Sequence, residues 1–308
     1  MRGAGLSERR PRRQNTGKRK QSMTEPHKID LHMHTTVSDG TDTPEEILDR
    51  VKENGIELFA VSDHDAIKGC DVIQRLRKPD DPQFLTGVEF SCRDEEGQYH
   101  ILGYRYDPAA ESVQELVKKG HRIRMKKIHT RLDFLEREFG IVFSPEEIEE
   151  LLTLDNPGKP HLANLMVKNG YADSKETAMH NYLNKLRIRM DFLGPEEAIA
   201  GILAGGGIPV LAHPTYGNGD QLIQGENMDR RLQRLMAYGL QGVEGFYSGF
   251  SPAIRKEILD FAERYHLYVT AGSDYHGKNK LIHLGDTGLT PETVFPEGLH
   301  RFLEAIEA

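Results

Sequence analysis

Short apolar runs alternate with helical patterns along most of this chain, and this alternation predicts an α/β fold. The runs are four to six residues long and end at polar or glycine-rich turns, as buried strands do. Strands are expected at residues 28–33, 58–61, 84–88, 99–104, 208–212, 242–246 and 267–271.

Helix signals lie between these runs. Thr43, Pro44 and Glu46 form the capping box of a helix start, and this helix is expected to end near Asn54 and Gly55. Further helices are predicted over residues 195–203, 228–238 and 251–265. The order of elements is that of an α/β barrel.

The middle of the chain has a different character. From residue 111 to about 187 the pattern is helical, with little strand signal. Apolar side chains step by three and four residues there, which places them on one helix face. They are Met125, Ile128, Leu132, Leu135 and Phe139. The sequence therefore predicts a barrel that is interrupted by a helical insertion.

Composition sets limits on location and partners. The chain has 308 residues, 48 acidic and 40 basic side chains, a net charge of −8 and two cysteines. No apolar run approaches the ~20 residues that span a bilayer, so no membrane partner is expected. Two cysteines cannot form a disulfide framework, which favours a reducing, cytoplasmic location.

The first 22 residues are strongly basic, with eight Lys or Arg and one acid. Their composition predicts a disordered basic extension. The remaining chain has 32 basic and 47 acidic residues, so a surface for duplex DNA is not expected.

Side chains that bind metals recur at the ends of the predicted strands. His32 and His34 lie on one face of a strand about 7 Å apart, close enough to chelate one ion. Asp39 offers a carboxylate in the Ser-Asp-Gly turn that follows. Either feature alone is more often structural than functional.

His64 stands between Asp63 and Asp65 after an apolar strand, and such carboxylates can orient a ligand from behind. The pattern continues along the chain. Further candidate donors near strand ends are Glu89, His100, His213, Asp274 and His276.

Together these donors indicate a metal centre. Parallel α/β folds gather their strand ends at one face, and so many unpaired polar groups are costly there unless cations offset them. Imidazole and carboxylate without thiolate favour Mn, Fe, Zn or Co. Nine donors are too many for one ion, so two or three divalent ions are expected. A cluster of this kind catalyses hydrolysis, usually of phosphate esters.

The strings that carry these donors are IDLHMHT, SDG, VSDHD, GVEFSC, YHILGY, LAHP and GSDYH, in this order. They closely resemble the motif series of the PHP (polymerase and histidinol phosphatase) superfamily. Within it, the chain resembles the small metal-dependent phosphoesterases, which include nucleoside 3′,5′-bisphosphate phosphatases and 5′→3′ exoribonucleases. The resemblance implies a distorted (β/α)7 barrel with an inserted helical subdomain and a trinuclear metal centre.

The resemblance covers about residues 27–290. It implies a discontinuous barrel built from residues 23–107 and 194–308. Residues 108–193 are then the helical insertion, which is expected to form a lid over the active site.

The resemblance also assigns the donors to three ions. The first ion is held by His32, His34, Glu89 and Asp274. These residues act in catalysis through the water bound to that ion, which attacks phosphorus. Glu89 bridges to a second ion with His100 and His213. The third ion is held by Asp39, His64 and His276. Some relatives have histidine at the position of Asp39, so the oxygen ligand here favours Mn or Mg for this ion. Asp30, Asp63 and Asp65 are expected behind the ligands.

Substrate residues are expected in the insertion. Residues 118–131 carry seven basic side chains and no acid, which by itself is typical of a solvated helix face. Arg124 aligns with an arginine of the relatives. Lys159 and His161 resemble their Arg-x-His element, although lysine cannot bind phosphate in the bidentate way of arginine. The expected substrate is a nucleotide or a short oligonucleotide.

Two alternatives stay open at this point. One is a histidinol-phosphate or other small-molecule phosphatase, which the long insertion disfavours. The other is a non-catalytic PHP module that metals only stabilise, which the complete donor set disfavours. The sequence leaves the oligomeric state, the metal identity and the general acid open.

Overall fold

The structure is a computed structural model, and it describes Met1 and residues 26–187, 190–217 and 221–307. The predicted basic extension over residues 1–22 lies outside the described residues except for Met1. Seven strands form one sheet in chain order. They are β1 (Ile29–Asp30), β2 (Leu58–Val61), β3 (Gln83–Arg93), β4 (Gln98–Tyr104), β5 (Ile208–Leu211), β6 (Gly242–Tyr247) and β7 (Tyr268–Gly272).

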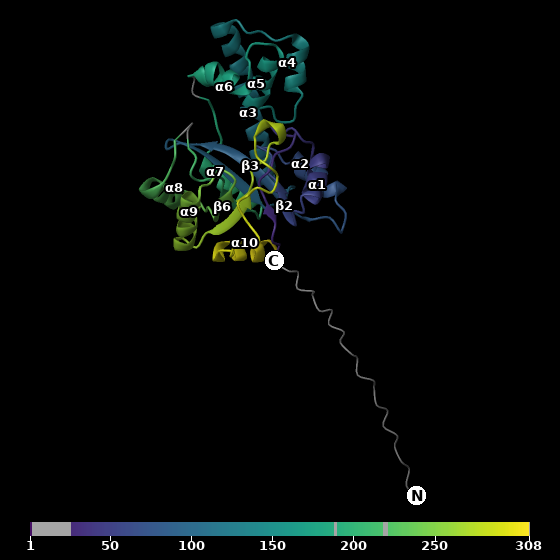
Figure 1. Cartoon of the computed structure of the whole chain (residues 1–308), viewed down its shortest axis with the longest axis vertical. Helices are drawn as coiled ribbons and strands as arrows, with labels where there is room; N and C mark the ends of the chain where they lie inside the picture. The colour runs from purple at the N-terminus through teal and green to yellow at the C-terminus, as the bar shows by residue number, and fades with distance from the viewer. Residues whose placement is uncertain (2–25, 188–189, 218–220, 308) are drawn as a thin grey trace.

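The sheet is nearly closed into a barrel, as predicted (Figure 1). The backbone N–H of Leu31, just after β1, donates to the carbonyl of Ala271 in β7 at 2.8 Å. His34 donates in the same way to Tyr275, also at 2.8 Å. The first and last strands therefore lie side by side, which brings the His32 and Asp274 regions together.

One strand runs against the others. β4 pairs antiparallel with both β3 and β5, whereas the remaining pairs are parallel. The prediction that Glu89 ends a strand is therefore wrong. β3 continues to Arg93, because pairing with β4 satisfies the backbone beyond Glu89.

Helices cover the outside of the barrel (Figure 1). They are α1 (Pro44–Glu53), α2 (Lys68–Leu76), α7 (Pro195–Ala204), α8 (Gly225–Ala237), α9 (Pro252–Arg264) and α10 (Glu297–Glu307). The capping box of Thr43 and Glu46 is confirmed, and Asn54 caps the other end of α1. Helices α2 and α10 were not predicted from the sequence.

The insertion stands on one end of the barrel as a helical subdomain (Figure 1). It contains α3 (Glu111–Phe139), α4 (Pro145–Leu152), α5 (Lys159–Lys168), α6 (Lys175–Asn181) and the short 3-10 helix η1 (Leu183–Lys185). These helices share a core of their own, in which Ile128 and Leu135 of α3 pack with Leu162 and Met166 of α5. No helix in the described part of the chain has the length and apolarity to span a bilayer.

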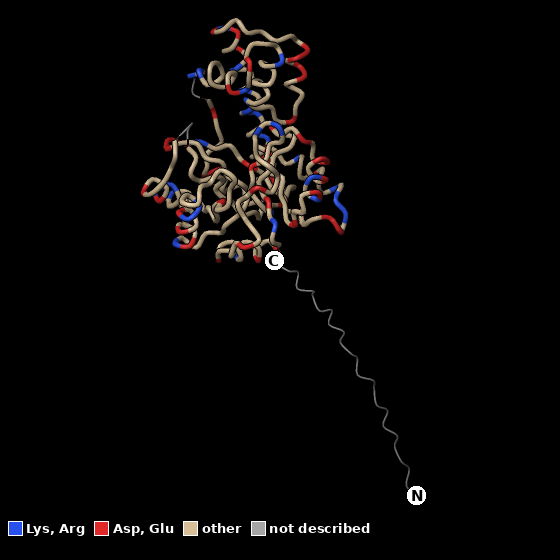
Figure 2. Tube along the Cα trace, in the orientation of Figure 1, with Lys and Arg blue, Asp and Glu red and all other residues tan. Residues whose placement is uncertain are grey.

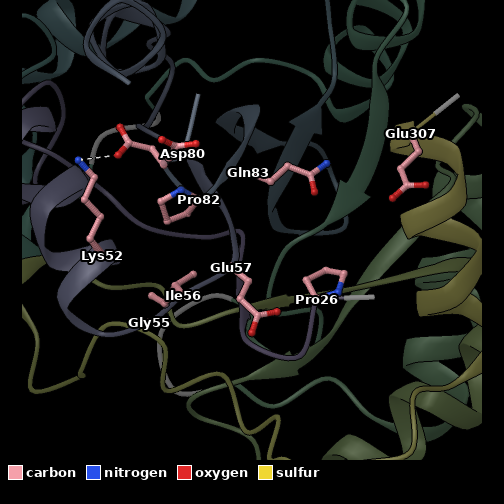
Figure 3. A pocket seen from close by; sticks show the side chains of 10 residues that line it. Pro26, Lys52, Gly55, Ile56, Glu57, Asp80, Pro82, Gln83 and Glu307 are labelled. Carbon is pink, nitrogen blue, oxygen red and sulfur yellow. Dashed lines mark ion pairs between the residues drawn. The ribbon is translucent and has the colours of Figure 1, made fainter. Parts of the chain in front are cut away.

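The two ends of the barrel differ in chemistry. A hollow of about 570 Å³ lies at the end where the parallel strands begin, lined by Lys52, Glu57, Gln83 and Glu307 among others (Figure 3). Its Lys52 pairs with Asp81 at 3.0 Å. The predicted metal donors lie at the opposite end.

Candidate metal centre

All nine predicted metal donors come together at the end of the barrel that faces the helical subdomain. Seven of them are buried, and His100 and His213 are partly exposed. Eight of them, all but His213, form three overlapping groups in which the donor atoms of each group lie within 4.8 Å of one another. The groups are His32, His34 and Asp274; His64, Glu89 and His100; and His34, Asp39, His64 and His276.

The first group has the dimensions of a metal site. The Nε2 atoms of His32 and His34 lie 3.3 and 3.2 Å from Oε2 of Glu89. The same two nitrogens lie 3.5 and 3.4 Å from Oδ1 of Asp274. Ligand atoms at ~2.1 Å around a tetrahedral ion are about 3.4 Å apart, so these four side chains fit one ion.

The other oxygen of Glu89 faces His100 and His213. Glu89 Oε1 lies 2.8 Å from Nδ1 of His100 and 3.2 Å from Nε2 of His213. The two imidazole nitrogens are themselves 3.2 Å apart. Glu89 therefore has one oxygen directed to each of two donor groups, which is the arrangement of a bridging carboxylate.

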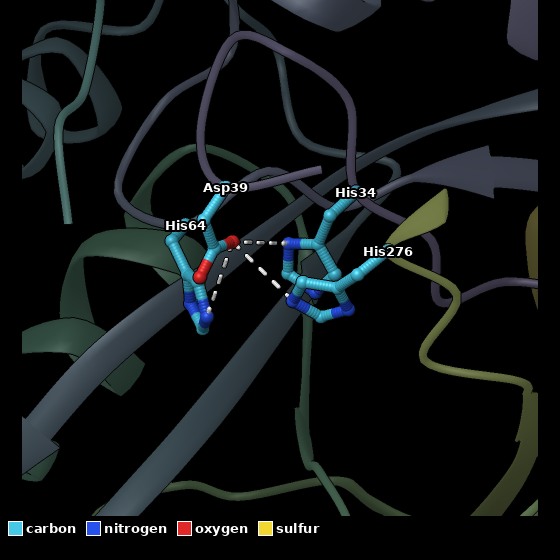
Figure 4. Close-up of side chains that lie close together, drawn as sticks. All are labelled: His34, Asp39, His64 and His276. Atoms are coloured by element: carbon cyan, nitrogen blue, oxygen red, sulfur yellow. Dashed lines mark ion pairs between the residues drawn. The ribbon is translucent and has the colours of Figure 1, made fainter. Parts of the chain in front are cut away.

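The third group surrounds Asp39 (Figure 4). Oδ1 of Asp39 lies 3.3 Å from Nε2 of His276, 4.0 Å from Nε2 of His64 and 3.9 Å from Nδ1 of His34. His64 also turns Nδ1 toward Glu89 Oε2, at 3.0 Å. His34 and His64 thus join this group to the other two.

Several of these donor atoms are buried without a hydrogen-bond partner among the described residues. They are His32 Nε2, His34 Nε2, Asp39 Oδ1, His64 Nδ1 and Glu89 Oε2. A buried polar atom without a partner costs ~1–3 kcal/mol, so five in one place are unfavourable for the protein alone. Divalent cations bound between them satisfy all five, and the donor set therefore fits metal ions.

The protonation states of His34 and Glu89 suit the binding of cations. Burial lowers the pKa of His34 to about 4, with help from the neighbouring His276 and His64. Burial opposes the ionised form of Glu89, yet His100, His64 and His32 hold the pKa of Glu89 well below its usual value. His34 is therefore neutral and Glu89 ionised at neutral pH, which are the forms that bind metals.

Glu244 of β6 supports two of the donors and was missed by the sequence analysis. Its Oε1 lies 2.9 Å from Nδ1 of His32, and its Oε2 accepts from the backbone N–H of His213 at 2.7 Å. A Cβ at Gly272 would collide with both His32 and Glu244, so the neighbouring strand needs glycine there. The available signal was a glutamate within an otherwise apolar strand.

Asp274 is held by two further residues that the sequence analysis did not connect to it. Lys280 Nζ lies 2.5 Å from Oδ2 of Asp274, and the Tyr247 hydroxyl donates to the same oxygen at 3.0 Å. Burial opposes the charge of Asp274, but Lys280, His32 and His276 hold its pKa well below the usual value. Oδ1 is thereby left to face the histidines.

The aspartates that were expected behind the ligands act mainly on the backbone. Asp30 accepts from the N–H and hydroxyl of Ser273 at 2.9 and 2.6 Å, which fixes the turn before Asp274. Asp63 accepts from Thr35 and Ser38 and so holds the loop that leads to Asp39.

Asp65, directly after His64, accepts from the backbone N–H of Ser91 at 2.9 Å. Asp65, His213 and Asp274 adopt positive φ angles of 51°, 26° and 59°. Such angles are strained in residues with a side chain and are typical of functional sites. The backbone is thus bent at three points around the donors.

The predicted substrate residues divide into two places. Arg124 Nε binds Asp65 at 2.6 Å, and its Nη2 donates to the Ser91 hydroxyl at 3.0 Å. His161 is close to Arg124, since both approach Gly158. Lys159 instead reaches away and donates to Asn184 at 2.8 Å. Arg124 and His161 therefore lie at the rim of the metal centre, and Lys159 lies farther into the helical subdomain.

Comparison with curated proteins finds relatives over most of the chain. A phosphoribosyl 1,2-cyclic phosphate 1,2-diphosphodiesterase of Eggerthella lenta is 29% identical, covering 83% of this chain and 97% of that protein. A 5′-3′ exoribonuclease of Haemophilus influenzae is 28% identical, covering 87% and 97%. A 3′,5′-nucleoside bisphosphate phosphatase of Chromobacterium violaceum is 29% identical, covering 80% and 87%.

Solved structures share the fold. A proposed metal-dependent phosphoesterase of Bifidobacterium adolescentis superposes with a TM-score of 0.78 and 28% identity, covering 91% of this chain and 98% of that one. A Chromobacterium violaceum amidohydrolase structure gives a TM-score of 0.77 at 26% identity, covering 91% and 96%. The model of the PHP domain matches residues 30–187, which are 158 of the 308 residues. The chain therefore belongs to the PHP domain family.

Proposed function

We propose that this chain is a metal-dependent phosphoesterase that hydrolyses phosphate esters of nucleotides. The expected substrates are a 3′,5′-bisphosphonucleotide or the 5′ end of a short RNA. The observation that carries the proposal is the convergence of nine imidazole and carboxylate donors, five of them with buried atoms that lack a partner. The relatives named above differ in substrate, but all their names describe the hydrolysis of a phosphate ester.

We propose the following division of the donors. His32, His34, Glu89 and Asp274 hold one ion, and Glu89 shares a second with His100 and His213. Asp39, His64 and His276 hold a third. Divalent ions at these places supply an activated water and neutralise the charge that develops on phosphate.

The donor types suit Mn, Fe or Zn, and Asp39 favours Mn or Mg at the third place. We also propose a reducing, cytoplasmic location, because Cys70 and Cys92 are both free and buried.

The protein's own residues position the substrate. Arg124 and His161 lie at the rim of the centre, where a guanidinium and an imidazole can donate to phosphate oxygens. Because Arg124 also binds Asp65 and Ser91, its side chain is held in place before a substrate arrives. His161 Nδ1 accepts from Gly158 N–H at 2.9 Å, which leaves Nε2 as the nitrogen that carries a proton toward a ligand.

We further propose that residues 108–193 form a lid over this site. Three contacts join the insertion to the rim of the barrel. Arg124 binds Asp65, Asn156 Nδ2 donates to the carbonyl of His64, and Lys175 Nζ donates to Asn279 Oδ1 at 2.7 Å. Each contact reaches a proposed metal ligand or a residue near one.

Metal analysis and phosphatase assays on purified protein test the proposal. We expect two to three divalent ions per chain and hydrolysis of p-nitrophenyl phosphate, of a 3′,5′-bisphosphonucleotide and of 5′-labelled short RNA. The Asp274→Ala and His32→Ala variants should bind less metal, and their kcat/KM should fall at least a hundredfold. His27→Ala is the matched control, because His27 is exposed and precedes β1 at the opposite end of the barrel.

The assay also separates the alternatives. A preference for histidinol phosphate over nucleotides favours the small-molecule phosphatase. Metal binding without hydrolysis of any phosphate ester favours the non-catalytic module. Full metal content and full activity in both variants would overturn the proposed centre.

A further inference from the structure

A row of cations extends from the metal centre along one face of α3. Arg124, Lys127 and Arg131 are three and four residues apart, so their side chains share this face. Lys159, at the start of α5, lies near Arg131. Burial lowers the pKa of Lys159, and the charge of Arg131 adds to this effect. We call these four residues the cation row.

The cation row has little negative charge to balance it. Arg124 pairs with Asp65, and Lys159 donates only to the neutral amide of Asn184. Lys127 and Arg131 form no hydrogen bond or ion pair with any residue that the structure describes. Lys127 is 9% exposed, and its Nζ lies over the ring of Phe192, 3.2 Å from the centroid.

Other basic residues of the same helix behave differently. Lys118 pairs with Glu115 at 2.9 Å, Lys119 with Glu197 at 2.6 Å, and Lys126 with Asp191 at 2.7 Å. The cation row is therefore not an ordinary solvated helix face. Among its four cations, only Arg124 has a carboxylate partner in the described part of the chain.

Such an arrangement is unfavourable for the protein alone. Burial and the like charges of Arg124 and Arg131 lower the pKa of Lys127 to about 7, although Asp65 and Asp191 act in the opposite direction. Burying a charge without a partner costs free energy, and a bound anion offsets that cost. The row has the properties of an anion site.

The position of the row relates it to the metal centre. It begins at Arg124, whose partner Asp65 follows His64. Arg131 lies two helical turns farther, about 10 Å along the axis. Ile128 and Leu135 of the same stretch pack into the core of the helical subdomain. Figure 2 shows Lys and Arg positions where that subdomain joins the barrel.

We propose that Lys127 and Arg131 bind a second phosphate of the substrate, beyond the phosphate that is hydrolysed. The substrate class in this inference rests on the proposed function. The second phosphate has two sources, the other phosphate of a nucleoside bisphosphate or a phosphodiester link of an oligonucleotide. The length of the row favours the oligonucleotide.

The test compares two double variants of the metal-loaded full chain. At pH 6.5, where Lys127 carries its charge, Lys127→Gln/Arg131→Gln removes two charges from the row. Lys118→Gln/Arg122→Gln removes the same charge from exposed positions on the same helix. Steady-state kinetics are measured on p-nitrophenyl phosphate, on adenosine 3′,5′-bisphosphate and on a 5′-phosphorylated tetra-adenylate.

For the row variant we expect the KM of the tetra-adenylate to rise at least tenfold while kcat and the kinetics of p-nitrophenyl phosphate stay unchanged. The slope of log KM against log salt should fall by about 1.4, since each contact to single-stranded nucleic acid contributes about 0.7. If the KM of the bisphosphate rises in the row variant as much as that of the tetra-adenylate, the second phosphate is that of the nucleoside bisphosphate. Unchanged KM values for both phosphate-rich substrates, or an equal rise for p-nitrophenyl phosphate, would overturn the inference.

A binding experiment separates this inference from the proposed function. Fluorescence anisotropy of the tetra-adenylate, labelled at its 3′ end, needs no catalysis and is measured with and without a chelator. Weaker binding to the row variant, in a protein that hydrolyses nothing, supports the site and contradicts the phosphoesterase. If the wild type hydrolyses phosphate esters but the two double variants bind the tetra-adenylate equally well, the phosphoesterase is supported and the second phosphate site is contradicted. If the row variant unfolds by circular dichroism, the single Arg131→Gln variant carries the same test.

Discussion

The Nδ1 atom of His32 lies 2.9 Å from Oε1 of Glu244, and both side chains are fully buried. This contact fixes the imidazole as a donor through Nδ1, because an ionised carboxylate only accepts. When the ring is neutral, Nε2 is the nitrogen with a lone pair, and it faces Glu89 and Asp274. Glu244 thereby selects the form of His32 that binds a metal ion.

Replacing Glu244 by glutamine should weaken metal binding by about tenfold to a hundredfold. Glu244 uses both oxygens, one toward His32 and one for the N–H of His213, whereas glutamine has one oxygen and an amide that opposes the second donor. Titration against a chromogenic chelator measures the affinity. Glu263→Gln on the exposed face of α9 is the control. Equal metal affinity in Glu244→Gln and the wild type would contradict this role.

Removing metal should lower the thermal stability. The cluster holds buried donor atoms without partners, and a ligand present at 100 times its Kd stabilises a protein by about 2.7 kcal/mol. We expect a chelator to lower Tm by a few degrees, and excess Mn²⁺ to restore it. Glu89→Gln removes a charge common to two donor groups, so its Tm should no longer respond to Mn²⁺. A chelator-insensitive wild type is the contrary outcome.

Binding of an oligonucleotide should weaken as the pH rises through about 7. Lys127 is a base whose pKa is lowered to about 7 by burial and by Arg124 and Arg131, with Asp65 and Asp191 opposing them. Lys127 is therefore charged below that pH and neutral above it, and only the charged form attracts phosphate. Anisotropy at pH 6.5 and 8.5 measures the change. In Lys127→Met, binding should change less between pH 6.5 and 8.5 than in the wild type. Identical pH profiles of the wild type and this variant would refute the role of Lys127 in binding phosphate.

Neither cysteine should react in the native protein. Burial raises the pKa of Cys70 to about 12 and that of Cys92 well above its usual value. At pH 8 the thiolate fraction of Cys70 is then about one in ten thousand, and the thiolate is the reactive form. Mass spectrometry after iodoacetamide should find no alkylation before denaturation and two alkylated thiols after it. Rapid labelling of Cys92 in the folded protein would show that this side chain is accessible.

Local signals in the sequence identified much of the fold. The capping box at Thr43 fixed the start of α1, because that motif satisfies the free N–H groups of a first turn without distant partners. The apolar runs placed β2, β5, β6 and β7 to within one residue at each end, whereas β1 is shorter than the predicted strand over residues 28–33. The pairing between distant segments was not predicted from the sequence. The extension of β3 past Glu89 depends on β4, and no residue near Glu89 signals it.

In the site too, local signals could be read from the sequence, whereas contacts between distant residues could not. The donors were found because imidazoles and carboxylates at successive strand ends are unusual, and the structure brings all nine together. Glu244 and Lys280 act through contacts with residues that are distant or across a turn, and neither belongs to a recognisable string. The balance of charges along α3 also required the structure, because the partners of Lys119 and Lys126 are Glu197 and Asp191, which lie far from them in the sequence.

The central claim is that the nine donors hold a cluster of metal ions, and anomalous diffraction tests it most directly. Crystals of the protein loaded with Mn²⁺ would be measured on both sides of the manganese edge. The account predicts two or three anomalous peaks within about 2.0–2.2 Å of the donor atoms, with Glu89 between two of them. Peaks elsewhere, or no peak among His32, Glu89 and Asp274 in protein that contains manganese, would contradict it.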